Sequence, residues 1–300
     1  MVSLVNLVLS ILVGGLGPAV PLALASVGEI ATERSGIVNI GIEGMMLISG
    51  LVAAVATYYT GSPLLGLLCG GFMGFLLGLL FGYVSAYLKA NQIVAGIGVN
   101  LLAVGVAVAV LQAIWGGPGQ SSSLPTLSSI CVAGVCFSPY GLLLLICIPV
   151  LAYYVLERTA LGLIVKSCGE DPRAAEAMGV PVELVQCLVT GCAGFLHGLA
   201  GSYLVLGYIG RFTRTITAGR GFIALAIVVI SNWNPVAALI ASYLFGVAEV
   251  TSLTLQVVVG APGVAELFNT LPYVAAIVAV AVYGVRAKAP AWLGRIFVRE

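Results

Sequence analysis

Charged residues are scarce in this sequence. Only 8% of the 300 residues are Asp, Glu, Lys or Arg, whereas soluble domains carry about 25%. Hydrophobic residues make up 61% of the chain, so water is not its main solvent. The formal net charge of +1 also excludes a strongly basic nucleic-acid-binding surface and an acidic solvating tail. We therefore expect no nucleic-acid partner.

Recognisable catalytic and metal-binding patterns are missing as well. The seven cysteines follow no metal-ligand spacing, and most lie in apolar runs, where a thiol behaves as a small hydrophobic side chain. No Gly-x-x-x-x-Gly-Lys-Ser/Thr motif is present, so we expect neither ATP hydrolysis nor a bound cofactor in this chain. Cys131 and Cys136 lie in a polar stretch that we place outside the membrane, where either a disulfide or a free pair is possible.

Long apolar runs fill most of the chain. Each is close to the roughly 20 residues that a helix needs to cross a bilayer, and each is too long for a barrel strand of about 10 residues. The sequence predicts one all-α polytopic membrane domain, residues 1–300, with about nine (eight to ten) transmembrane helices, some of them broken by Gly or Pro. The expected spans are Leu4–Ala25, Ile37–Thr57, Leu64–Leu88, Ile93–Trp115, Tyr140–Leu156, Val182–Tyr208, Thr217–Ile230, Pro235–Val259 and Leu271–Val285.

Basic residues predict the orientation, because cytoplasmic loops are enriched in Lys and Arg. Both the longest charged stretch, residues 157–183, and the C-terminal tail are rich in them, so both are expected in the cytoplasm. An even number of expected spans separates the two, and counting backwards places the uncharged N-terminus outside. The basic residues are Arg158, Lys166 and Arg173 in the stretch and Arg286, Lys288, Arg295 and Arg299 in the tail.

Two expected spans carry glycine at helical spacing. A stripe without side chains allows another helix to approach closely, so packing within the chain is the simplest interpretation. A role in lining a path or in pairing subunits is the alternative. The glycines are Gly66, Gly70, Gly74, Gly78 and Gly82 in the third span and Gly191, Gly194, Gly198 and Gly201 in the sixth.

Polar side chains interrupt the apolar runs at a few positions. Asn39 and Glu43 are four residues apart, hence on one helical face, at the start of an apolar run where an ionisable group usually faces a cavity or a partner. A structural contact, such as Glu43 capping a broken helix, explains the pattern equally well. Amide groups both donate and accept, which suits a neutral, hydroxyl-rich or heterocyclic ligand. The candidates for a translocation path are Asn39, Glu43, Asn91, Gln92, Asn100 and His197.

The charged stretch after the fifth span predicts a short, rigid helix. Asp171 can cap a helix that begins at Pro172, and the good helix formers that follow stop at Gly179. Such an element can fit a groove on a soluble partner and transmit its movement to the spans. A well-capped connector is the alternative. The residues assigned to this helix are Gly169, Glu170, Asp171, Pro172, Arg173, Ala174, Ala175, Glu176 and Gly179.

Three stretches resemble the permease subunits of bacterial ATP-binding-cassette importers, in the branch that serves nucleosides, simple sugars and branched-chain amino acids. They are residues 33–46 (ERSGIVNIGIEGMM), 91–100 (NQIVAGIGVN) and 169–179 (GEDPRAAEAMG), and together they resemble the nucleoside importer permeases most closely. The resemblance extends over nearly the whole chain. It implies a permease in the bacterial cytoplasmic membrane, in which residues 169–179 form the coupling helix seated on an ATPase.

The resemblance also implies partners and a mechanism. Two cytoplasmic ATPase subunits would use ATP, a second permease, either a relative or a copy of this chain, would complete the membrane part, and an extracytoplasmic binding protein or lipoprotein would deliver the solute. Solute would cross by alternating access, with no catalysis by the permease itself. Three arginines fall on the outer side of the expected topology, against the charge rule. Acidic residues of the binding protein could dock there, on Arg211, Arg214 and Arg220.

Other interpretations of the sequence remain open at this point. An ion-coupled secondary transporter would need a coupling-ion site, for which Glu43 and Glu249 are scattered candidates. A membrane-embedded enzyme would show clustered Asp, Glu, His or Cys, which the sequence does not contain. A permease for a simple sugar or a branched-chain amino acid differs from the main prediction only in its solute.

Overall fold

Helices form almost all of the regular structure in the computed structural model, which describes residues 4–132, 135–259, 268, 270–284 and 287–297. Val285, Arg286 and Arg299, which entered the predictions above, lie outside these residues. The helices are α1 (Leu4–Gly14), α2 (Leu16–Arg34), α3 (Ile42–Thr60), α4 (Pro63–Ala86), α5 (Gln92–Trp115), α6 (Pro139–Arg158), α7 (Ala160–Glu170), α8 (Pro172–Ala177), α9 (Val182–Tyr203) with a π-helical extension η1 (Leu204–Ile209), α10 (Arg220–Ile230), α11 (Pro235–Val259) and α13 (Leu271–Tyr283).

Seven helical segments of the described chain are long and apolar enough to cross a membrane. This confirms the prediction of an all-α, multi-pass membrane protein. The count of nine is not confirmed, because α10 and α13 have 11 and 13 residues, fewer than the roughly 20 of a full crossing. The seven segments are Val5–Arg34, Ile42–Thr60, Pro63–Ala86, Gln92–Trp115, Pro139–Arg158, Val182–Ile209 and Pro235–Val257.

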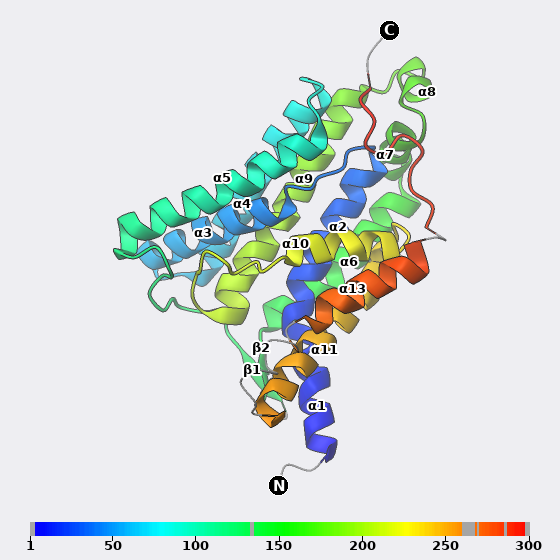
Figure 1. Cartoon of the computed structure of the whole chain (residues 1–300). Coiled ribbons are helices and arrows are strands. Elements are labelled where there is room, and N and C mark those ends of the chain that lie inside the picture. The colour runs from blue at the N-terminus through cyan, green and yellow to red at the C-terminus, as the bar shows by residue number, and fades with distance from the viewer. Residues whose placement is uncertain (1–3, 133–134, 260–267, 269, 285–286, 298–300) are drawn as a thin grey trace.

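The two ends of the molecule differ in structure (Figure 1). The N-terminal helix α1 lies at one end, near a small hairpin of β1 (Ile130–Val132) and β2 (Val135–Phe137). In that hairpin Cys131 lies opposite Cys136 and forms a disulfide with it, which decides between the two alternatives for this pair. Helices α7 and α8 and the C-terminal residues lie together at the other end.

The two glycine stripes pack against each other. A β-carbon added to Gly74 of α4 would lie 2.3 Å from the carbonyl oxygen of Gly194 in α9. One added to Gly198 would lie 2.5 Å from the carbonyl oxygen of Gly70. The backbones of α4 and α9 therefore touch directly, and glycine is required at this contact because no larger residue leaves room for it.

Two features at the ends of helices differ from the expected spans. Helix α2 continues to Arg34 instead of ending near Ala25, so it carries Glu29 and Glu33 inside the helical bundle. The charged stretch after α6 contains a second helix, α7, before the predicted one. Hydropathy alone missed both, because a hydropathy profile ends a span where polar residues begin, even when the helix continues through them.

Candidate functional site

A buried, non-helical segment separates α2 from α3. It comprises residues 35–41, and its side chains at Ser35, Ile37 and Asn39 are at most 1% exposed. An unwound backbone in apolar surroundings needs hydrogen-bond partners from the protein, because the surrounding lipid offers none. The residues around this segment therefore show what holds it in place.

Side chains of α2 and α5 bind the backbone of this segment. The Oε1 atom of Gln92 accepts a hydrogen bond from the amide of Val38 at 2.8 Å, and Oε1 of Glu29 accepts one from the amide of Asn39 at 2.8 Å. Asn100 binds both the segment and the first turn of α3, because its Nδ2 donates to the carbonyl of Ile40 at 3.0 Å and its Oδ1 accepts from the amide of Gly44 at 2.7 Å. The segment is thus fixed by carboxylate and amide groups of α2 and α5.

The remaining amide candidates also contact backbone. Asn39 accepts a hydrogen bond from the amide of Gly41 at 2.9 Å through its own Oδ1, within the segment. Asn91 caps α5, because its Oδ1 accepts from the amides of residues 93 and 94. His197 is fully buried in α9 beside α2, where a β-carbon on Gly28 would come within 2.9 Å of its Nε2. The structure therefore gives the two asparagines supporting hydrogen bonds and buries His197 against α2, and contact of these residues with a solute stays a prediction.

Glu43 fastens α3 to the start of α10. Its Oε1 accepts a hydrogen bond from the amide of Gly219 at 2.7 Å, and its Oε2 accepts one from the amide of Gly221 at 2.7 Å. A carboxylate at this place also interacts favourably with the positive end of the helix dipole. Glu43 thus caps a short helix inside the bundle, as the structural alternative in the sequence analysis proposed.

The three arginines predicted for docking fall into two environments. Arg211 and Arg214 are exposed on the loop between η1 and α10, and Arg211 donates to Oε1 of Gln120 at 3.4 Å. Arg220 instead forms an ion pair with Glu249 of α11, and the two side chains are only 12% and 20% exposed. Arg220 is therefore held inside the chain, away from the other two.

The predicted short helix of the charged stretch is present as α8. Oδ1 of Asp171 accepts hydrogen bonds from the amides of Arg173 and Ala174, both at 3.1 Å, and Pro172 occupies the first helical position. The chain ends the turn at Gly179, whose φ of 86° favours glycine. These caps stabilise α8 at both ends. Arg173 and its neighbour Ala174 are exposed.

The C-terminal residues 287–297 bind this short helix region to the unwound segment. The amide of Trp292 donates to the carbonyl of Gly169 at 2.8 Å, and the amide of Gly294 donates to the carbonyl of Gly36 at 3.0 Å. Phe297 is buried in a small apolar cluster with Cys168, Ala175 and Val182. Burial there raises the pKa of the Cys168 thiol to about 11, so this thiol stays neutral and serves packing.

The turn between α10 and α11 reaches the same region. Nε1 of Trp233 donates to Oε2 of Glu33 at 2.6 Å, and the carbonyl of Trp233 accepts from Nη2 of Arg34 at 3.3 Å. Oδ1 of Asn232 accepts from the amide of Lys288 at 2.7 Å. This turn, the end of α2 and the C-terminal residues therefore form one connected hydrogen-bonded unit.

Sequence reasoning did not find Glu29 or the C-terminal contacts, and it included Glu33 only as the first residue of the stretch 33–46, without a partner. A signal for the two glutamates was present, because they lie four residues apart and therefore on one face of a helix. The contacts of Trp292 and Gly294 carried no such signal, since their partners are more than 100 positions away in the chain.

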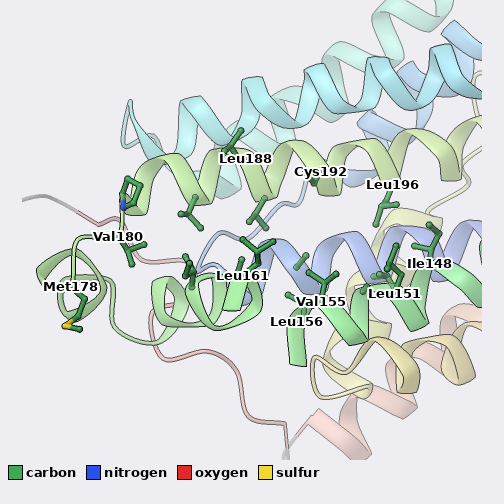
Figure 2. A pocket seen from close by; sticks show the side chains of 18 of the residues that line it. Ile148, Leu151, Val155, Leu156, Leu161, Met178, Val180, Leu188, Cys192 and Leu196 are labelled. Atoms are coloured by element: carbon green, nitrogen blue, oxygen red, sulfur yellow. The ribbon is translucent and has the colours of Figure 1, made fainter. Parts of the chain in front are cut away.

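One cavity near these elements is apolar. It is a groove of about 770 Å³ lined by α6, α7 and α9, with Met178 and Val180 at one end (Figure 2). Aliphatic side chains line nearly all of it, so it offers a polar solute almost no hydrogen bonds. Among the described residues no cluster of His, Cys, Asp and Glu could hold a metal ion.

Comparison with known proteins now identifies the family. Residues 11–282 match the family model described as branched-chain amino acid transport system, permease component. The chain belongs to this family of permeases. No solved structure shows significant similarity to the chain.

Individual relatives match over almost their full length. A nucleoside ABC transporter permease protein of Lactococcus lactis, NupC, is 34% identical over 90% of this chain and 90% of its own. A guanosine ABC transporter permease protein of Bacillus subtilis, NupQ, is 32% identical over 91% of each chain. A putative glucose ABC transporter permease protein of Haloferax volcanii is 34% identical over 79% of this chain and 75% of its own.

Replacing Asn100 tests the role given to the amides. In Asn100→Leu the carbonyl of Ile40 and the amide of Gly44 lose their partners, and each buried, unpaired group costs about 1–3 kcal/mol. We expect a lower melting temperature of the purified protein in detergent. Gln112→Leu on α5 is the control, because that amide is exposed near the end of the helix and should have little effect. Equal melting temperatures for the two variants would contradict the assignment.

Proposed function

We propose that this chain is the transmembrane permease subunit of an ATP-driven importer of nucleosides. The observation that carries the solute class is the similarity, over nine-tenths of the chain, to a nucleoside permease and a guanosine permease. The arrangement of α8, the C-terminal residues and the unwound segment supports a device that passes movement from one end of the molecule to its interior. Membership of a permease family gives no support to an ion-coupled secondary transporter.

The partners follow from the same proposal. Two ATPase subunits would hydrolyse ATP and hold α8, and a second permease, a relative or a copy of this chain, would complete the membrane part. An extracytoplasmic binding protein or lipoprotein would deliver the solute. The end of the molecule with α7, α8 and residues 287–297 would then face the cytoplasm of a bacterium. The basic residues there agree with this orientation, because Lys166 belongs to α7 and Lys89 and Arg295 lie over the rings of Phe297 and Trp292.

A sugar is the second candidate solute. The relative from Haloferax volcanii, described as a putative glucose permease protein, is as similar in sequence identity as the nucleoside permease of Lactococcus lactis, although over a shorter part of the chain. Ribose-like and nucleoside solutes share hydroxyl groups, so amide and carboxylate side chains suit both. The nucleoside and guanosine permeases match 90% and 91% of this chain and the putative glucose permease only 79%, so a nucleoside is favoured.

An uptake assay tests the proposed function. The chain would be purified together with its ATPase and binding protein, placed in vesicles, and supplied with labelled guanosine, ribose or leucine. We expect uptake of the nucleoside that depends on ATP, because the ATPase drives the change of access. Uptake of ribose or leucine but not guanosine would show that the solute is a sugar or an amino acid and not a nucleoside. Uptake by the isolated chain under an ion gradient would refute the ATP-driven importer.

The coupling role of α8 has its own test. Replacing residues 170–173 with glycines removes the cap at Asp171 and the rigid first turn, so we expect ATP hydrolysis to continue while uptake per ATP falls at least about tenfold. Asp171→Asn is the matched control, because asparagine keeps the capping oxygen. Normal uptake by the glycine variant, in complexes of normal composition, would show that α8 is only a connector.

The exposed arginines support a docking surface. We propose that Arg211 and Arg214 orient the binding protein through its acidic residues, and that Arg220 is excluded because it pairs with Glu249. Reversal to Arg211→Glu with Arg214→Glu should raise the concentration of binding protein needed for half-maximal uptake, and the increase should shrink at high salt. Lys288→Glu, at the other end of the molecule, is the control. An unchanged concentration would eliminate this surface.

A further inference from the structure

A second, smaller cavity lies where α10, α11 and α13 meet. Its volume is about 280 Å³, just under the roughly 300–1,000 Å³ of sites for drug-sized ligands, so it suits a small solute. Unlike the apolar groove of Figure 2, it is lined by hydrogen-bonding groups as well as aliphatic ones. Its polar residues are Arg220, Glu249, Ser252 and Tyr273.

The charges in this cavity balance. Arg220 and Glu249 form an ion pair, so the cavity carries a donor and an acceptor of full charge with no net charge between them. A charged solute would lack a counter-ion here, whereas a neutral solute with hydroxyl and ring-nitrogen groups can accept from the guanidinium and donate to the carboxylate. Ionisable side chains inside a membrane protein are costly and usually mark a functional site.

The guanidinium also has a donor left over. Nη1 of Arg220 donates to the carbonyls of Ile216 and Thr217, at 3.2 and 3.4 Å, and Nη2 donates to Glu249. Its Nε is buried and has no hydrogen-bond partner in the described part of the chain. A buried donor without a partner is rare in a folded protein, and a solute would reach this one only after the guanidinium had turned toward the cavity.

The wall of this cavity is connected to the unwound segment. Arg220 is the first residue of α10, and Glu43 holds the amides on both sides of it. Glu43 follows residues 35–41 closely in sequence, so a displacement of that segment would move α10 and the ion pair. The hydroxyl of Tyr273, on the opposite wall, donates to the carbonyl of Ala218 at 2.5 Å and closes the same end of the cavity.

We propose that this cavity binds the transported solute during its passage, with Arg220 as donor and Glu249 as acceptor to a neutral, hydroxyl-bearing heterocyclic compound such as a nucleoside. This inference rests on the proposed function, since it names the place where the importer recognises its solute. The flat ring of Tyr273 supplies an apolar surface for the heterocycle.

Kinetics of uptake by the complete transporter in vesicles test the cavity, with labelled guanosine as probe. Glu249→Gln should raise KM about tenfold or more, the effect of losing one hydrogen bond to a charged group, while ATP hydrolysis without solute persists. Glu157→Gln is the control, because Glu157 belongs to an ion pair with Lys166 away from this cavity. The double variant Arg220→Glu with Glu249→Arg can keep an ion pair but exchanges the positions of donor and acceptor. A wild-type KM in this variant would show that the pair only holds α10 to α11, and would overturn the proposal.

A second variant tests the cavity without changing the ion pair, in case loss of that pair makes the protein misfold. Leu253 lines the cavity from α11, and Leu253→Trp should fill it and raise KM for guanosine. Leu244→Trp, on the same helix and also exposed but outside the cavity, should keep the wild-type KM. If the wild-type transporter takes up guanosine and both Glu249→Gln and Leu253→Trp keep its KM, the cavity is not the binding site, while the proposed function stands. Failure of the wild-type transporter to take up any nucleoside would overturn the proposed function and this inference together.

Discussion

The structure depends on one requirement, that the unwound backbone of residues 35–41 finds all its hydrogen-bond partners inside the protein. Lipid offers none, so each polar group left unpaired would cost several kcal/mol. Among these partners are Glu29, Gln92 and Asn100, whose side chains bind backbone groups of the segment. A segment held by side chains, without a helical ladder of its own, can also change partners more easily than a helix.

This segment connects the end of the molecule that carries α8 with α10 in the interior. On one side the C-terminal residues join Gly36 to Gly169, next to the capped helix α8. On the other side Glu43 joins the segment to the first turn of α10 and so to the ion pair with Glu249. The contacts are short, directional and continuous. A movement imposed on α8 therefore has a physical route to the interior, without any requirement that the long helices bend.

Local features of this fold could be predicted from the sequence, and long-range ones could not. The cap of Asp171, the stop at Gly179 and the glycine stripe of α4 each depend on a few neighbouring residues, and each is present in the structure. The target of Glu43 lies 176 positions away, and the sequence shows only that a carboxylate there needs a partner. Hydropathy likewise reports composition and not depth, which is why the apolar residues of α10 and α13 were taken for full crossings.

The two cavities show why size is a poor guide to the site of a polar solute. The groove between α6 and α9 is the larger, but a nucleoside entering it would leave its water and find almost no replacement for the lost hydrogen bonds. The cavity at Arg220 and Glu249 is smaller, yet it offers a paired charge of each sign and the hydroxyl groups of Ser252 and Tyr273. Binding energy for such a solute comes from satisfied hydrogen bonds. The arrangement of α10, held at its first turn by Glu43, is what keeps those groups turned toward the same space.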